Sequence, residues 1–113
     1  MKLNISKEFS TSPGPRLVIE GEASGEEFRI GFLLPRLKES ISRGERLVVN
    51  LDGVSGFGTS FLEESFGGLI RTDGYSLSEL KKFLDIQSNE VPEWIDEINE
   101  YMEQASNEKG QKK

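Results

Sequence analysis

The segment from Leu47 to Ile70 limits most strongly what this chain of 113 residues can fold into. It opens within an apolar run, Arg46–Leu51, in which leucine and valine fill nearly every position. A run this short, β-branched and apolar on both faces is typical of a central strand that is covered on both sides. A loop with three glycines, Gly53–Thr59, follows it, and an apolar helix comes next and is expected to end at Asp73-Gly74. The segment therefore predicts an α/β fold in which a buried strand leads through a tight loop into a helix.

The remaining elements follow from hydrophobic periodicity. Apolar and polar residues alternate at 1–6 and 84–87, and Leu17 and Ile19 would share one face at 16–20, which predicts three further strands. The first two strands in the chain are expected to form a hairpin with a wide turn. Helical spacing covers 24–44, with a kink or a break at Pro35, and also 60–72, 76–82 and 90–106. The order β-β-α-β-α-β-α predicts parallel pairs with helical crossovers in a mixed four-stranded sheet packed with helices. Residues 1–106 are expected to form a single domain, and 107–113 a disordered polar tail.

The composition excludes several kinds of chemistry. The chain has no cysteine and no histidine, which removes thiolate nucleophiles, the usual general base and the commonest zinc ligands. Its net charge of −6 argues against a nucleic-acid partner, because duplex binding depends on lysine and arginine. No apolar stretch is long enough for a membrane span or a signal peptide, so a cytoplasmic location without a membrane partner is expected. The chain is therefore predicted not to be an enzyme.

The loop Gly53–Thr59 resembles a phosphate cradle only in outline. A P-loop would need a lysine after its last glycine, but Gly58 is followed by Thr59 and Ser60. A dinucleotide fingerprint starting at Gly56 would need a third glycine where Phe61 stands. Both signatures fail, which favours a tight strand–helix junction, although three glycines are more than a turn requires. Binding of a small ligand or nucleotide by this loop remains the alternative function.

Two interpretations are open for Thr59 and Ser60, which stand where the helix begins. Ser60 with Glu63 has the spacing of a capping box, and residue chemistry alone favours that interpretation. A phosphoswitch is the sharper hypothesis, because a helix N-terminus favours the charge of a phosphate. Asp52, Glu63 and Glu64 offer only oxygen ligands, and Glu64 is expected to face solvent. No metal and no cofactor are therefore predicted.

Charged and aromatic residues mark two further surfaces. Arg29, Arg36 and Arg43 repeat every seven residues and would align along one ridge of a helix. A solvated face is the simpler account, with Glu39 four residues before Arg43 in the favourable order, and a binding ridge is the alternative. The stripe that includes Trp94 in the last helix is expected to be core, and a partner groove is the alternative there.

The motif Thr59-Ser60-Phe61-Leu62-Glu63-Glu64, followed by Phe66-Gly67-Gly68-Leu69, supports a family assignment. With the strand and loop before it, it resembles the STAS-like family of bacterial and archaeal domains of unknown function, which are related to the anti-sigma-factor antagonists. This resemblance implies the STAS-like layout of strands and helices over most of the chain. It also implies a regulatory domain that binds a protein partner, for which a histidine-kinase-like ATPase is the precedent.

The same resemblance points to particular residues. By position, Thr59 matches the hydroxyl that is phosphorylated in the antagonists, and Ser60 lies beside it. Gly58 departs from the pattern, because an acidic residue commonly precedes that hydroxyl. The expected function is thus a non-enzymatic regulatory interaction domain, and its oligomeric state is not predicted. The candidate partner-binding residues are Gly56, Phe57, Gly58, Thr59, Glu64, Arg36 and Arg43.

Overall fold

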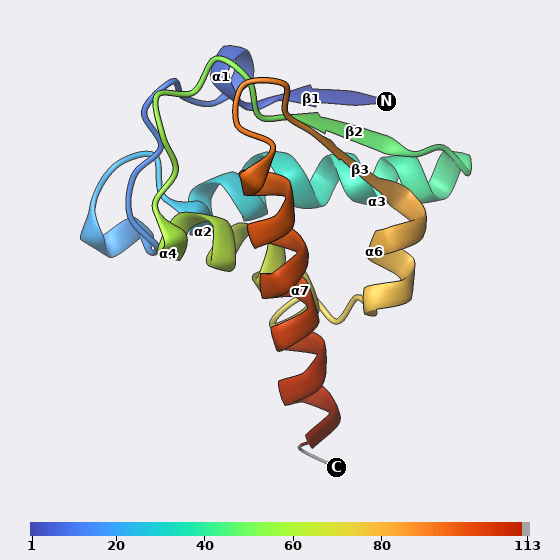
Figure 1. The fold of residues 1–113 in the computed structure, drawn as a ribbon. Coiled ribbons are helices and arrows are strands. Elements are labelled where there is room, and N and C mark those ends of the chain that lie inside the picture. The colour runs from blue at the N-terminus through green and yellow to red at the C-terminus, as the bar shows by residue number, and fades with distance from the viewer. Residues whose placement is uncertain (112–113) are drawn as a thin grey trace.

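The computed structural model describes residues 1–111, with no description of the Gln111 side chain, as a small sheet with helices packed beneath it (Figure 1). In chain order the elements are β1 (Lys2–Asn4), α1 (Ile5–Glu8), the 3-10 helix η1 (Val18–Glu20), α2 (Gly25–Phe28), the π-helix η2 (Arg29–Leu33), α3 (Leu34–Arg43), β2 (Leu47–Asn50), α4 (Thr59–Leu62), the π-helix η3 (Glu63–Gly67), α5 (Gly68–Arg71), α6 (Leu77–Phe83), β3 (Leu84–Gln87) and α7 (Glu93–Gln111). The α/β class is confirmed. Residues 107–111, for which a disordered tail was expected, continue α7, and 112–113 lie outside the described part.

The sheet has three strands within the described residues, and all of them are parallel. Their order is β1-β2-β3, so the predicted central position of β2 is confirmed. The mixed four-stranded sheet is wrong, because residues 16–20 form no strand and instead end in the 3-10 helix η1. The backbone N–H groups of Leu17 and Val18 donate to the carboxylates of Glu20 and Glu26, each at 2.9 Å. These side-chain acceptors take the place of a neighbouring strand. The apolar residues of 16–20 could not reveal that their backbone binds side chains instead.

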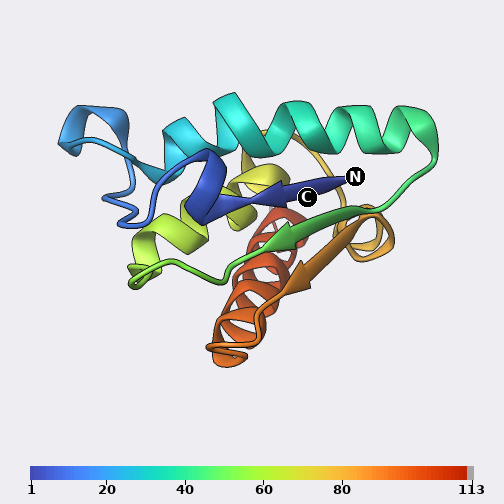
Figure 2. The same ribbon diagram turned by 90° about the horizontal axis from the view of Figure 1, so that it is seen from above.

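Apart from the short α1 at the end of β1, the helices lie on one side of the sheet (Figures 1 and 2). Leu47 and Val49 of β2 are fully buried beneath it, whereas Val48 and Asn50 point to the other face and are half-buried. The expectation that β2 is covered on both sides is therefore wrong. Val48 is a single apolar residue in an otherwise polar row on this face, so the unbroken apolar sequence of the strand was misleading.

Two long helical runs contain π-helical segments. The first extends from Gly25 to Arg43 through α2, η2 and α3, and the second from Thr59 to Arg71 through α4, η3 and α5. In the first run, the irregularity that Pro35 was expected to cause takes the form of the π-helix Arg29–Leu33 just before it, and helical backbone continues on both sides. π-helical segments are frequent at functional sites, and the two here contact each other.

Candidate functional site

The loop after β2 is anchored at its start by the turn that precedes α7. The Asp52 carboxylate accepts hydrogen bonds from the backbone N–H groups of Asn89 and Glu90, at 2.9 Å each, and one at 3.3 Å from the Ser88 hydroxyl. The bonds from the Glu90 and Asn89 N–H groups lower the pKa of Asp52. Glu90 in turn accepts from the N–H of Gly53 at 2.8 Å. These contacts make Asp52 an anchor for the loop.

The middle of the loop is held by the N-terminal segment and by aromatic packing. Both the N–H and the hydroxyl of Ser55 donate to the carbonyl oxygen of Thr11, at 2.8 and 2.9 Å. The Phe57 ring lies 5.6 Å from that of Phe61 in α4 and 4.7 Å from that of Trp94 in α7, measured between centroids. Phe57 is thus a partly buried packing residue, and Trp94 contributes to the core as its spacing predicted.

The three glycines of the loop have different reasons to be there. Gly53 adopts φ +88°, and a Cβ on it would lie 2.6 Å from the Ser6 hydroxyl, so the backbone requires glycine at this position. Added Cβ atoms on Gly56 and Gly58 would meet nothing within 4 Å, and neither residue has a positive φ. The requirements of a turn therefore explain Gly53, while Gly56 and Gly58 leave the backbone beside Thr59 bare.

Thr59 and Ser60 begin α4 as exposed residues. The N-cap of this helix is Gly58, and it provides no side-chain capping bond, so the predicted capping role of Ser60 with Glu63 is wrong. Among the described residues neither hydroxyl has a hydrogen-bond partner. Glu63 instead binds Arg16 and Arg71, each through a contact of 2.5 Å. Burial raises the pKa of Glu63, but the hydrogen bonds from these arginines outweigh that effect and lower it.

Glu64 lies inside the protein, contrary to the expectation that it faces solvent. The π-helix η3 places it opposite Arg29 of η2, and its carboxylate accepts from the Arg29 guanidinium at 3.0 Å. Arg29 also donates to Asp73 at 2.8 Å, while its Nε is buried and has no hydrogen-bond partner among the described residues. Burial lowers the pKa of Arg29, but its bonds to Asp73 and Glu64 outweigh that effect and raise it. These three side chains, the buried ionic cluster, connect the two helical runs, so Glu64 is unsuited to bind a partner.

The arginine ridge is divided among three environments. Arg29 is buried, Arg36 is half-buried with contacts to Glu8 and to the carbonyl oxygen of Lys2, and Arg43 pairs with Glu39 as predicted. Arg43 ends α3 beside the start of β2, whereas the loop follows the other end of this strand. The structure therefore separates Arg43 from the candidate loop, and it does not align the three arginines as a binding ridge.

Within positions 1–111 no group of three or more acidic side chains is placed to hold a metal ion. No helix in this described range has the length and hydropathy needed to cross a membrane.

The family comparison agrees with the resemblance seen in the sequence. A family model for the STAS-like domain of unknown function (DUF4325) matches residues 24–92, which is more than half of the chain. The chain belongs to this family, and the predicted family membership is confirmed. No similar protein was found among the curated proteins, and none among the solved structures.

Proposed function

We propose that this chain is a non-enzymatic regulatory domain that binds a protein partner through the surface formed by Gly56–Ser60. The observation that supports this most directly is the pair of exposed, unbonded hydroxyls of Thr59 and Ser60 at the start of a helical run. Two glycines without side chains precede them, so a partner's backbone can approach closely. The loop is fixed at its start through Asp52 and in its middle through Phe57, which reduces the entropy lost on binding.

Phosphorylation of Thr59 or Ser60 is the proposed means of regulation. A phosphate at this position would add about two negative charges beside the N–H groups of the first helical turn, where such charge is favoured. Because the loop is held in place at its start and in its middle, the change would be one of surface charge and shape rather than of fold. The partner class proposed from the resemblance is a histidine-kinase-like ATPase.

The alternative of a nucleotide cradle has less support in the geometry. A cradle uses successive backbone N–H groups of its loop as donors. Here the N–H groups of Asp52, Gly53 and Ser55 already donate to Asn50, Glu90 and Thr11. Fewer donors are left for a phosphate, and no lysine stands in the loop to supply charge.

Binding to purified histidine-kinase-like ATPases from the source genome, measured by calorimetry, tests the proposal. Thr59→Glu and Ser60→Glu should weaken binding about tenfold or more if phosphorylation releases the partner. Ser42→Glu is the control, since Ser42 is equally exposed but lies on α3. Incubation with ATP and the bound ATPase should then phosphorylate wild type but not the double variant Thr59→Ala, Ser60→Ala.

Two results would contradict the proposal. One is equal binding by the Thr59, Ser60 and Ser42 variants, which would place the interface elsewhere. The other is a thermal shift of several degrees with a nucleotide and Mg²⁺ that Gly58→Val abolishes, because this would favour the nucleotide-binding alternative.

A further inference from the structure

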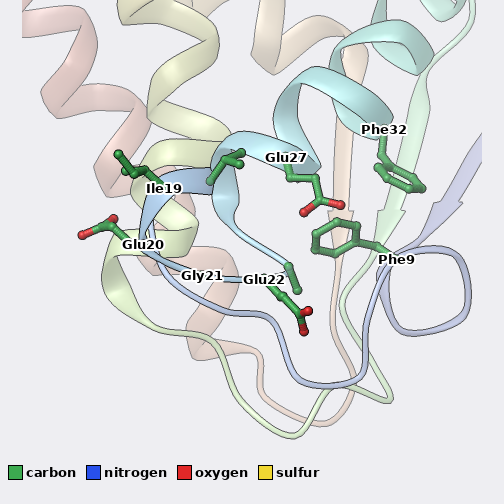
Figure 3. A pocket seen from close by; sticks show the side chains of 9 residues that line it. Phe9, Ile19, Glu20, Gly21, Glu22, Glu27 and Phe32 are labelled. Atoms are coloured by element: carbon green, nitrogen blue, oxygen red, sulfur yellow. The ribbon is translucent and has the colours of Figure 1, made fainter.

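A second surface, on the N-terminal side of the domain, has the properties of a binding groove (Figure 3). Its volume is about 630 Å³, and it is open to solvent. The aromatic rings of Phe9, which follows α1, and Phe32, in η2, border one part of it, and Val18 and Ile19 of η1 border another. Most of its lining residues precede position 24, where the match to the family begins, so the family assignment does not account for this groove.

The apolar residues beside the groove are unusually exposed. Ile19 is 91% exposed and Val18 is 57% exposed, although burial of such side chains normally stabilises a fold. They are neighbours in one short 3-10 helix and line the same groove as the Phe9 and Phe32 rings, rather than being scattered singly. A contiguous exposed apolar patch with a polar rim is the usual mark of an interaction site.

The segment that presents these side chains is fixed by hydrogen bonds. Besides the two carboxylate contacts of η1, the N–H of Gly14 donates to the carbonyl oxygen of Ala23 at 2.7 Å, and that of Gly25 donates to Pro15 at 2.8 Å. Ala23 itself has φ +53°, which costs free energy for any residue with a side chain and is found mostly where function demands it. The exposed position of Ile19 is therefore a property of an ordered turn.

The charge of the groove is entirely negative. Glu20, Glu22 and Glu27 are among its lining residues, which include no lysine or arginine. The Glu20 carboxylate accepts from a backbone N–H, but within the described residues Glu22 and Glu27 have neither a hydrogen-bond nor an ion-pair partner for their carboxylates. A second copy of this chain, with net charge −6, or an anionic lipid surface would be repelled by this rim.

We infer that this groove binds a basic amphipathic segment of another protein. Its apolar side chains would enter between Phe32 and Ile19, and its lysine or arginine side chains would reach Glu22 and Glu27. Apolar contact would supply most of the affinity, and charge complementarity would select the partner and speed its association. The inference does not depend on the Gly56–Ser60 surface, because the groove shares no residue with it.

The test uses a fluorescein-labelled peptide of leucine and lysine in helical spacing and a counterpart in which glutamate replaces lysine. Fluorescence anisotropy should show saturable binding of the basic peptide alone. Ile19→Ser should weaken that binding about tenfold or more, since it removes an apolar contact that the bound peptide would bury. Ile30→Ser is the matched control and should leave it unchanged, because Ile30 is 53% exposed but does not line the groove. Both side chains are exposed, so neither change should affect folding.

The acidic rim is tested by a second pair of variants. The double variant Glu22→Gln, Glu27→Gln should bind the basic peptide several-fold more weakly, and its affinity should depend less on salt. Glu100→Gln should change neither property, because Glu100 is an exposed residue of α7 outside the groove. Equal effects of Ile19→Ser and Ile30→Ser would overturn the inference, as would equal binding of both peptides. The inference would also be overturned if the protein self-associated in sedimentation, or bound anionic vesicles, and Ile19→Ser abolished that association. Since no ATPase is used, failure here leaves the result for Thr59 and Ser60 unaffected.

Discussion

At Gly68, one added carbon should disturb the buried contact that joins the two helical runs. A Cβ on Gly68 would lie 2.7 Å from Nε and 2.9 Å from Cδ of Arg29, the buried residue that joins the two helical runs. Ordinary contact between such atoms needs about 3.5–4.0 Å, so the guanidinium would have to retreat by roughly 1 Å. Its bonds of 3.0 Å to Glu64 and 2.8 Å to Asp73 leave no slack for that movement.

The expected loss of stability follows from two opposing effects. Breaking a buried ion pair costs about 3–5 kcal/mol, because charges are left without partners. Replacing a helical glycine by alanine stabilises the helix by about 1 kcal/mol, which partly offsets this loss. Gly68→Ala should therefore lower the free energy of unfolding by about 2–4 kcal/mol. In an Arg29→Ala background the clash is absent, and Gly68→Ala should raise the free energy of unfolding by up to about 1 kcal/mol.

Urea unfolding, followed by far-UV circular dichroism and by the fluorescence of Trp94, the single tryptophan, measures all four members of this cycle. Gly31→Ala is the matched control. Gly31 also lies in a helical run, but a Cβ on it would meet nothing within 4 Å, so this variant should gain about 0.5–1 kcal/mol. If Gly68→Ala is as stable as wild type, or if its effect is the same with and without Arg29, the buried ionic cluster does not join the helices as described.

Three further predictions concern the candidate site. The pKa of Glu63 is lowered by its arginine partners, so the stability that ionised Glu63 contributes should be lost as the pH falls below about 4. Glu63→Gln should therefore make the free energy of unfolding depend less on pH in this range. Gly53→Ala should destabilise the protein by about 1–2 kcal/mol because of its positive φ, whereas Gly58→Ser should stabilise it by a few tenths to 1 kcal/mol as a new N-cap. Phe57→Ala should expose Trp94 and shift its emission to the red without abolishing cooperative unfolding.

The segment with the clearest pattern was predicted best from the sequence. The strand at Leu47–Asn50, the loop after it and the helix from Thr59 all occur where periodicity and glycines placed them. The short strand Leu84–Gln87 also forms, parallel to β2, as the intervening helices required. Local patterns sufficed here because the same residues that set the secondary structure also form the core.

The errors arose where side-chain contacts that hydrophobic periodicity does not reveal decide the local structure. Leu17 and Ile19 have the spacing of one face of a strand, but the carboxylates of Glu20 and Glu26 bind the backbone there, and Ile19 is exposed. Glu64 was placed in solvent by assuming regular α-helical spacing. Every residue from Glu64 to Ile70 is buried, on and off the predicted apolar stripe, and Arg29 provides Glu64 with a partner inside the protein. Pro35 was the available signal for the irregular turn that precedes it.

The anchoring of the loop determines what kind of regulation this surface can support. Asp52 is bound by the turn before α7, and Ser55 is bound to Thr11. Among the described residues, the stretch from Gly56 to Ser60 makes hydrogen bonds within its own helical run and none to other segments. Within that stretch Phe57 is packed against Trp94. A phosphate on Thr59 would find no mobile lid to close and no buried partner to release. It would therefore act directly on the bound protein, through charge and size at the contact. Under this proposal, a partner that senses the phosphate must touch the start of α4 itself.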